Sequence, residues 1–159
     1  MHIWIIDKKE ELKILRKTCA PFDFSKYGKE EVRTLLKAMK EMMRAADGIG
    51  LSANQIGLDI SVFVARVEGK SYEIFNPRIT KTSSEQIEFE EGCLSIPGSF
   101  GLVDRPEKIV LTGQDKNGKA VKIKAWGLLA RVFQHEVDHL NGKLFVDKAR
   151  KVQKIEPQK

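Results

Sequence analysis

Two histidines lie four residues apart in the stretch VFQHEVDHLNG, residues 132–142. Residues four apart on an α-helix share one face, so His135 and His139 can coordinate one divalent cation. Glu136 lies about 100° round the helix from His135, and its carboxylate can still reach a water beside such an ion. H-E-x-x-H on a helix is therefore typical of metal-dependent hydrolases. The alternative is a core helix with hydrogen-bonded histidines, but burying two imidazoles and a carboxylate without a metal would be costly.

A catalytic metal site needs a third protein ligand. The segment after His139 contains no His or Cys, and its only carboxylates are Asp147 and Glu156, neither at a spacing typical of zinc peptidases. The ligand is therefore expected upstream, where the chain has two cysteines, Cys19 and Cys93. We favour Cys93 because it follows a predicted strand within the turn FEEGCLSIPG, whereas RKTCAPF around Cys19 has no ligand-like context. Taken alone, Cys93 fits an inert buried thiol equally well.

A glycine-containing segment, DGIGLSANQIG at 47–57, follows the first long helical pattern. Its two glycines, Gly48 and Gly50, allow the backbone to approach another group closely. Alone, the segment predicts only a tight turn, and Gln55 reads as a surface amide.

The composition is that of one folded domain. The chain has 159 residues, of which 42% are hydrophobic and 31% charged. No apolar run is long enough to span a bilayer, and the first residues do not resemble a signal sequence, so we expect a cytoplasmic protein with no membrane contact. The net charge of +6 is compatible with solubility alone and also with weak attraction to RNA or acidic peptides.

The elements that must position these residues follow from periodicity. Apolar residues at three- and four-residue steps predict helices over 29–47 and 127–141, and the second is apolar on most sides, as in a buried helix. Between them the texture is that of short strands, and DKNG at 115–118 predicts a hairpin. On the second helix Leu128 and Val132 share the stripe of the histidines. The predicted fold class is α+β, with antiparallel sheets packed around a buried central helix that carries H-E-x-x-H, plus an N-terminal helix.

Three segments taken together resemble the peptide deformylase family, which carries G-x-G-L-A-A-x-Q, E-G-C-L-S and Q-H-E-x-D-H-L-x-G in that order. This sequence has GIGLSANQ at 48–55, EGCLS at 91–95 and QHEVDHLNG at 134–142. The resemblance covers nearly the whole chain from about residue 12. One departure is Ser52, where the family usually has alanine; the small side chain is expected to preserve the turn and to add a hydrogen bond.

The resemblance implies removal of the formyl group from N-formylmethionyl peptides, with release of formate. It implies one divalent metal ion, with iron(II) native and zinc, nickel or cobalt able to substitute. The implied roles are metal ligation by Cys93, His135 and His139, acid–base catalysis by Glu136, and oxyanion stabilisation by Gln55 and the backbone N–H of Leu94. The implied substrate-binding residues are Ile49, Gly50, Phe89, Glu91, Leu128 and Val132.

Further expectations concern the surroundings of the site. Glu91 and Arg105 look like the family's buried ion pair that supports the Cys93 loop, and Arg131 is expected to be solvated or paired. Some relatives have an arginine that binds the peptide backbone where Phe100 stands here. We expect a catalytic domain over 1–147 and a short basic tail over 148–159.

Two other functions remain open on the sequence alone. A zinc peptidase would need an open groove and a third carboxylate or histidine ligand. A catalytically silent module would bind ribosomes or RNA by charge. The tail, which contains Pro157, is too short for the long C-terminal helix by which many relatives contact the ribosome, so we expect weak ribosome contact through the basic surface at most. No specific nucleic-acid site is expected.

Overall fold

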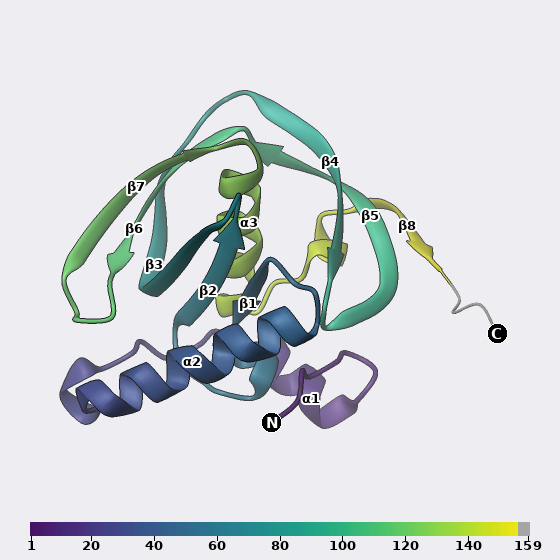
Figure 1. The fold of residues 1–159 in the computed structure, drawn as a ribbon. Helices are drawn as coiled ribbons and strands as arrows, with labels where there is room; N and C mark the ends of the chain where they lie inside the picture. Colours follow the sequence, from purple (N-terminus) through teal and green to yellow (C-terminus); the bar gives the residue numbers. More distant parts are fainter. Residues whose placement is uncertain (156–159) are drawn as a thin grey trace.

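The computed structural model describes residues 1–155 and places three α-helices and two antiparallel sheets in them (Figure 1). The helices are α1 (Lys9–Leu15), α2 (Lys29–Ala45) and α3 (Gly127–Leu140). The strands are β1 (Gly50–Ser52), β2 (Val62–Val67), β3 (Lys70–Thr82), β4 (Gln86–Cys93), β5 (Ile96–Pro106), β6 (Lys108–Gln114), β7 (Ala120–Trp126) and β8 (Arg150–Lys154). None of the described helices is both long enough and apolar enough to cross a membrane.

The larger sheet has the order β1-β2-β3-β6-β7, and its strands alternate in direction. The predicted hairpin at 115–118 joins β6 and β7, and Asp115 closes its turn by accepting hydrogen bonds from the backbone N–H groups of Asn117 and Lys119. Asn-Pro is typical of a turn between strands, but β3 runs through both Asn76 and Pro77. Asn76 has a φ of 49°, and the pairing of β3 with β6 shifts register between Phe75 and Arg78. The strand is therefore irregular at this point, but it is not interrupted.

Strand β2 is buried on both faces, which explains why VFVARV is apolar almost throughout. Val62 and Val64 pack with α2, whereas Phe63 and Ala65 pack with α3 on the opposite face. Nine of the fourteen residues of α3 are buried, and the helix contacts strands of both sheets. The predicted α+β fold with a helix buried between antiparallel sheets is therefore confirmed, and Figure 1 shows α3 enclosed by the strands.

The smaller sheet has the order β4-β5-β8 and its own small core, made of Ile96, Val103, Leu144 and Phe145. Sequence patterns did not predict β5, because glycine and proline interrupt its alternation. They also assigned the tail over 148–159 no secondary structure, yet β8 lies within it and pairs with β5. Every residue of β8 is exposed. Pro157 and Glu156 lie outside the described residues.

Candidate metal centre

Cys93, His135 and His139 bring their ligand atoms together at one point. These atoms all lie within 4.8 Å of one another. His139 Nε2 is 3.1 Å from His135 Nε2 and 3.2 Å from Cys93 Sγ. The histidines come from one face of α3, one turn apart, and the cysteine comes from the end of β4. The structure thus brings together the two segments that the sequence analysis connected through Cys93.

This donor set fits a divalent transition metal. Two nitrogens bound tetrahedrally at about 2.0–2.1 Å lie about 3.3 Å apart, close to the observed separation of the two imidazole nitrogens. Thiolate and imidazole ligands suit zinc and iron rather than magnesium or calcium. Both histidines present Nε2 to the shared point, so each ring leaves Nδ1 free for a supporting partner. Within the described residues, His139 Nδ1 is buried without a hydrogen-bond partner.

Glu91 supports this centre through a buried ion-pair network. One carboxylate oxygen lies 2.9 Å from His135 Nδ1, an arrangement that fixes the ring and leaves Nε2 free for a metal. Arg105 donates two hydrogen bonds to the same carboxylate, at 2.6 and 2.8 Å, and Arg131 donates a third at 2.6 Å. Arg105 also bonds Asp138 at 2.9 Å. The expected Glu91–Arg105 pair is present, and Arg131, expected to be solvated or paired, is buried and paired.

Burial and neighbouring charges shift the pKa values of three side chains at the centre. Burial alone would lower the pKa of His135, but the Cys93 sulfur and the Glu91 carboxylate raise it to about 10. Burial lowers the pKa of His139 well below its ordinary value, so this imidazole is neutral, as a ligand must be. Burial also raises the pKa of Glu136 above that of a free glutamate, although Ser52 and nearby cations oppose the shift.

Glu136 is held beside the ligands by residues of β1. The fully buried Ser52 hydroxyl donates to Oε2 of Glu136 at 2.6 Å. Gly50 lies against the same carboxylate: a Cβ at this position would be 2.9 Å from Glu136 Cδ and closer still to Oε1. A side chain at position 50 would therefore displace the carboxylate. Serine at position 52, where the family usually has alanine, was expected to add a hydrogen bond, and its hydroxyl does so by donating to Glu136.

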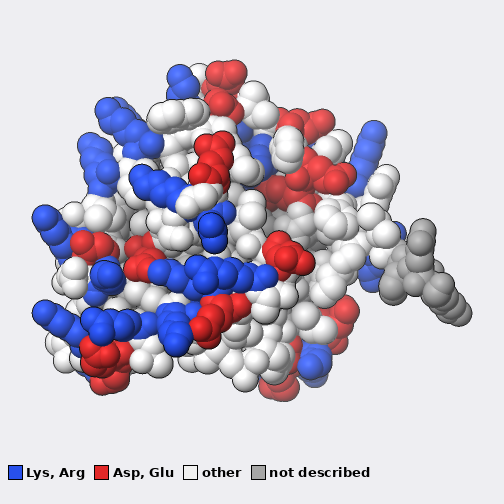
Figure 2. Space-filling view, viewed as in Figure 1, with Lys and Arg blue, Asp and Glu red and all other residues white. Residues whose placement is uncertain are grey.

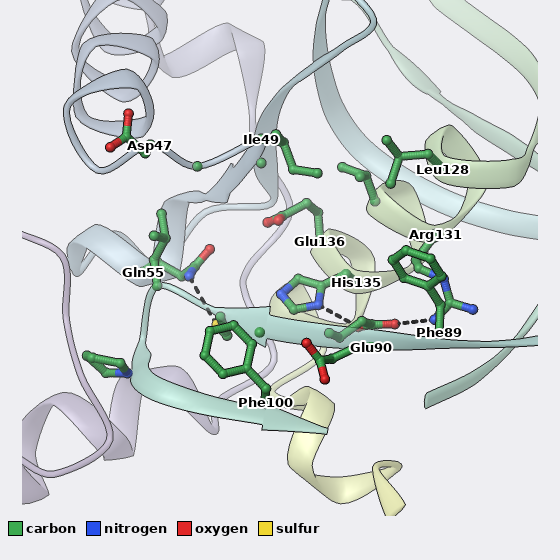
Figure 3. Close-up of a pocket in the computed structure, with 18 of the residues that line it drawn as sticks. Asp47, Ile49, Gln55, Phe89, Glu90, Phe100, Leu128, Arg131, His135 and Glu136 are labelled. Carbon is green, nitrogen blue, oxygen red and sulfur yellow. Dashed lines mark hydrogen bonds and ion pairs between the residues drawn. The ribbon is translucent and has the colours of Figure 1, made fainter. Parts of the chain in front are cut away.

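Gln55 faces the centre from the opposite wall (Figure 3). Its Oε1 accepts a hydrogen bond from the Ser52 backbone N–H at 3.0 Å, which orients the amide nitrogen toward β4. That nitrogen donates to the Ser95 hydroxyl at 3.1 Å and lies 3.7 Å from Cys93 Sγ. Gln55 is almost fully buried, so the surface-amide reading was wrong. Leu94 follows Cys93 directly and also lines the pocket.

The centre lies on the wall of a pocket of about 590 Å³. Three apolar side chains around it are unusually exposed: Ile49 by 48%, Phe89 by 58% and Leu128 by 45%. Figure 3 shows them around the space into which Glu136 and His135 point. Every residue predicted to bind substrate lines this pocket: Ile49, Gly50, Phe89, Glu91, Leu128 and Val132. Both carboxylate oxygens of Glu91, however, are engaged by its protein partners.

Other candidates lie away from the centre. Asp147 pairs with Arg16 at 2.6 Å and accepts the Leu144 backbone N–H, and Glu156 lies outside the described residues. Cys19 belongs to the core between α3 and the larger sheet. Sequence reasoning missed Ser95 and Asp138. The motif containing Asp138 was recognised, but nothing in the local pattern showed that its carboxylate would meet Arg105, which lies 33 positions away in the sequence.

Comparisons with known proteins agree with this geometry. A family model described as polypeptide deformylase matches residues 3–155. A peptide deformylase of Treponema pallidum is 46% identical over 119 residues, which cover 75% of this chain and 74% of the relative. One from Chloroflexus aurantiacus is 38% identical over 91% of this chain and 85% of its own length. The crystal structure of peptide deformylase from Thermotoga maritima superposes with a TM-score of 0.85 at 34% identity, covering 94% of this chain and 97% of that one.

The same likeness extends to a probable peptide deformylase from the Synechococcus phage S-SSM7, with a TM-score of 0.84 and 41% identity over 93% of this chain and 99% of that one. Members of this family are metal-dependent hydrolases that remove the N-formyl group from nascent peptides, and this chain carries the family's three motifs around one pocket whose Cys93, His135 and His139 donors fit a metal ion. The chain belongs to the polypeptide deformylase family.

Proposed function

We propose that Glu136, Gln55 and the Leu94 backbone N–H carry out deformylation beside an ion held by Cys93, His135 and His139. The observation that carries this proposal is the convergence of the three ligand atoms next to a buried glutamate on the wall of an apolar-rimmed pocket. A bound divalent ion supplies Lewis acidity and lowers the pKa of water at the site. The remaining steps belong to side chains of this chain.

Glu136 accepts the proton of the attacking water and then passes it to the leaving amine. Its raised pKa suits the first step, because a carboxylate with a higher pKa is a stronger base. The second step follows because the leaving amine is a stronger base than the carboxylate and takes the proton from it. The hydrogen bond from Ser52 occupies Oε2, so Oε1, beside Gly50, is the oxygen that we assign to the proton. The Gln55 amide nitrogen and the Leu94 N–H stabilise the developing oxyanion.

Specificity for formylmethionine would come from the pocket walls. Ile49, Phe89, Leu128 and Val132 offer apolar surface for an unbranched thioether side chain. Gly50 keeps the backbone close to the reacting atoms, so a formyl group fits where a bulkier acyl group would not. We assign Glu91 to support of His135 in preference to direct substrate contact, because its carboxylate is already surrounded by two arginines and a histidine. Phe100 lines the pocket where some relatives carry arginine.

We assign iron(II) as the native ion, with zinc, nickel or cobalt as substitutes. The Cys/His/His donor set suits all of these metals, and the choice of iron(II) rests on the family resemblance. We also propose that the protein acts in the cytoplasm, and that any ribosome contact is weak and uses the basic surface. Residues 1–147 form the proposed catalytic domain, and 148–159 form a short basic tail whose strand β8 pairs with β5.

Anaerobic purification, metal analysis and a formate-release assay on formyl-Met-Ala-Ser test this proposal together. The wild-type chain should contain about one metal ion and release formate. Glu136→Gln should keep the metal and lose activity by about 10²–10⁴-fold. Cys93→Ser should lose metal and activity together. Casein cleavage without formate release, or metal content and activity that survive Cys93→Ser, would instead support a peptidase with a different ligand set.

A further inference from the structure

No helix covers the outer face of the larger sheet over β6, β7 and the second half of β3 in the described residues, and we call this region the bare face. Side chains in register across this face form three rows: Arg78–Thr112–Lys122, Lys81–Val110–Lys124 and Lys108–Trp126. Helix α2 covers β1, β2 and the first half of β3 on this same side, where Val62, Val64 and Phe75 pack against it, but it does not reach these rows. The opposite faces of these strands, with Leu111 and Ile109, pack against α3.

The bare face carries five cations: Arg78, Lys81, Lys108, Lys122 and Lys124. None of the five forms an ion pair within residues 1–155. No carboxylate occupies any position of the three rows, although Glu107 precedes Lys108 in the chain. Figure 2 shows basic side chains gathered along the edge of the molecule where β7 lies in Figure 1. The face is therefore a concentration of uncompensated positive charge in a protein of net charge +6.

Trp126 stands among these cations and is 68% exposed. It lies directly across from Lys108 in the pairing of β6 with β7, and Lys124 is its neighbour on the same face. A hollow of about 520 Å³ lies between Trp126 and the lysines Lys81, Lys108 and Lys124. An exposed indole adds nothing to the packed core, but it offers a flat surface on which a planar ring can stack.

We propose that this face binds single-stranded RNA without sequence specificity, with phosphates on the five cations and one base stacked on Trp126. An aromatic platform within a basic surface is the common design of proteins that bind single strands by stacking and charge. Duplex RNA fits less well, because its bases are already stacked on one another and unavailable to the indole. A lipid surface also fits less well, because apart from the indole the three rows offer only a half-buried valine for insertion.

The position of the face gives this binding a consequence. Trp126 is two residues before Leu128, which lines the metal-site pocket. RNA held on the sheet would therefore lie near the pocket. Nascent peptides emerge from the ribosome, which is rich in RNA, so such binding would keep the pocket close to its substrates. The face itself shares no residue with that pocket, so the inference does not depend on the proposed catalytic roles.

Fluorescence anisotropy with a labelled single-stranded RNA of mixed sequence tests the proposal. Five phosphate contacts predict a slope of about −3.5 for log K against log salt, which is a loss of roughly 10²-fold between about 50 and 200 mM salt. Lys81→Ala/Lys122→Ala/Lys124→Ala should reduce the slope to about −1.4. Trp126→Ala should weaken binding roughly 5- to 150-fold and leave the slope unchanged.

A charge-matched control uses three exposed lysines elsewhere, Lys9→Ala/Lys26→Ala/Lys143→Ala, which should preserve both affinity and slope. All variants should deformylate formyl-Met-Ala-Ser like the wild type, which shows that they are folded and separates this test from the test of catalysis. The proposal is overturned if the control triple weakens RNA binding as much as the face triple. It is equally overturned if RNA does not bind at low salt, or if anionic vesicles or polyglutamate bind in a Trp126-dependent way and RNA does not.

Discussion

Replacing Ser52 with alanine removes the only side-chain hydroxyl that contacts Glu136 within the described residues. The serine is fully buried and Glu136 is nearly so, so no bulk water replaces the lost donor. The hydrogen bond favours the ionised carboxylate and holds its pKa below the value that burial alone would set. Its removal should therefore raise the pKa of Glu136 further.

The size of the effect follows from the energy of the bond. A hydrogen bond to a charged group contributes about 1.5–3 kcal/mol, and 1.36 kcal/mol corresponds to one pKa unit, so the shift should be roughly one to two units upward. Glu136 must be ionised to accept a proton from water. The acid limb of the pH profile of kcat/KM should therefore move upward by the same amount. At pH values below the acid limbs of both proteins, the kcat/KM of the variant should be roughly 10- to 100-fold lower than that of the wild type. At pH values above both acid limbs the two should agree within a few-fold, since the family usually has alanine at this position.

The assay is formate release from formyl-Met-Ala-Ser between about pH 5 and 9, at constant metal loading. Ser99→Ala is the matched control, because it also removes a buried hydroxyl but lies on β5 outside the pocket. A profile lowered equally at every pH, or an acid limb that stays in place, would refute the electrostatic role of Ser52. Metal content measured on each variant separates this effect from loss of the ion.

Three other perturbations have defined outcomes. Gly50→Ala places a methyl group against the Glu136 carboxylate and should reduce kcat by about 10²-fold, whereas Gly28→Ala, where a Cβ meets nothing closer than 3.6 Å, should not. Glu91→Gln leaves two buried guanidinium groups without their carboxylate and should lower the free energy of unfolding in urea by about 3–5 kcal/mol at neutral pH. Because the pKa of Glu91 is depressed, the difference from wild type should shrink as pH falls below its ordinary value of 4.5; a constant difference would contradict the assignment. Burial and the nearby Asp59 raise the pKa of Cys19 from 9.0 to about 11, so stability should decline over that interval in wild type and decline less in Cys19→Ala, as measured by urea unfolding in alkali.

The elements that strong periodicity predicts are present, whereas those with interrupted patterns were missed. The helices α2 and α3 and the β6–β7 hairpin follow from apolar spacing and from turn chemistry, both of which are local properties. Strand β5 contains two glycines and two prolines, and only its pairing with β4 and β8 makes it a strand. The exposed β8 likewise exists through backbone pairing, which leaves no mark on the residue pattern.

The site shows the same division. The spacing of His135 and His139 predicts a shared face from helix geometry alone. Local context favoured Cys93 over Cys19 as the third ligand, but it fitted an inert thiol equally well, because a ligand from another element is set by tertiary packing. Local patterns gave no sign that Arg131 would turn inward to Glu91, since a lone arginine on an amphipathic helix ordinarily faces solvent. Without the resemblance, Gln55 was interpreted as a surface amide, because only tertiary packing brings its side chain to Ser95 and Cys93.

The small core of the β4-β5-β8 sheet has a consequence for how the protein opens. That core has four buried apolar residues, whereas the cores on either side of the larger sheet have twelve and eleven. Local opening should therefore begin there, and amides of β4 and β5 should exchange hydrogen with solvent before those of β2. The same motion would carry the Cys93 sulfur away from the histidines, which stay on α3. The half-life of the bound ion would then follow local exchange in β4, and a variant could lose its metal quickly while its melting temperature stayed the same.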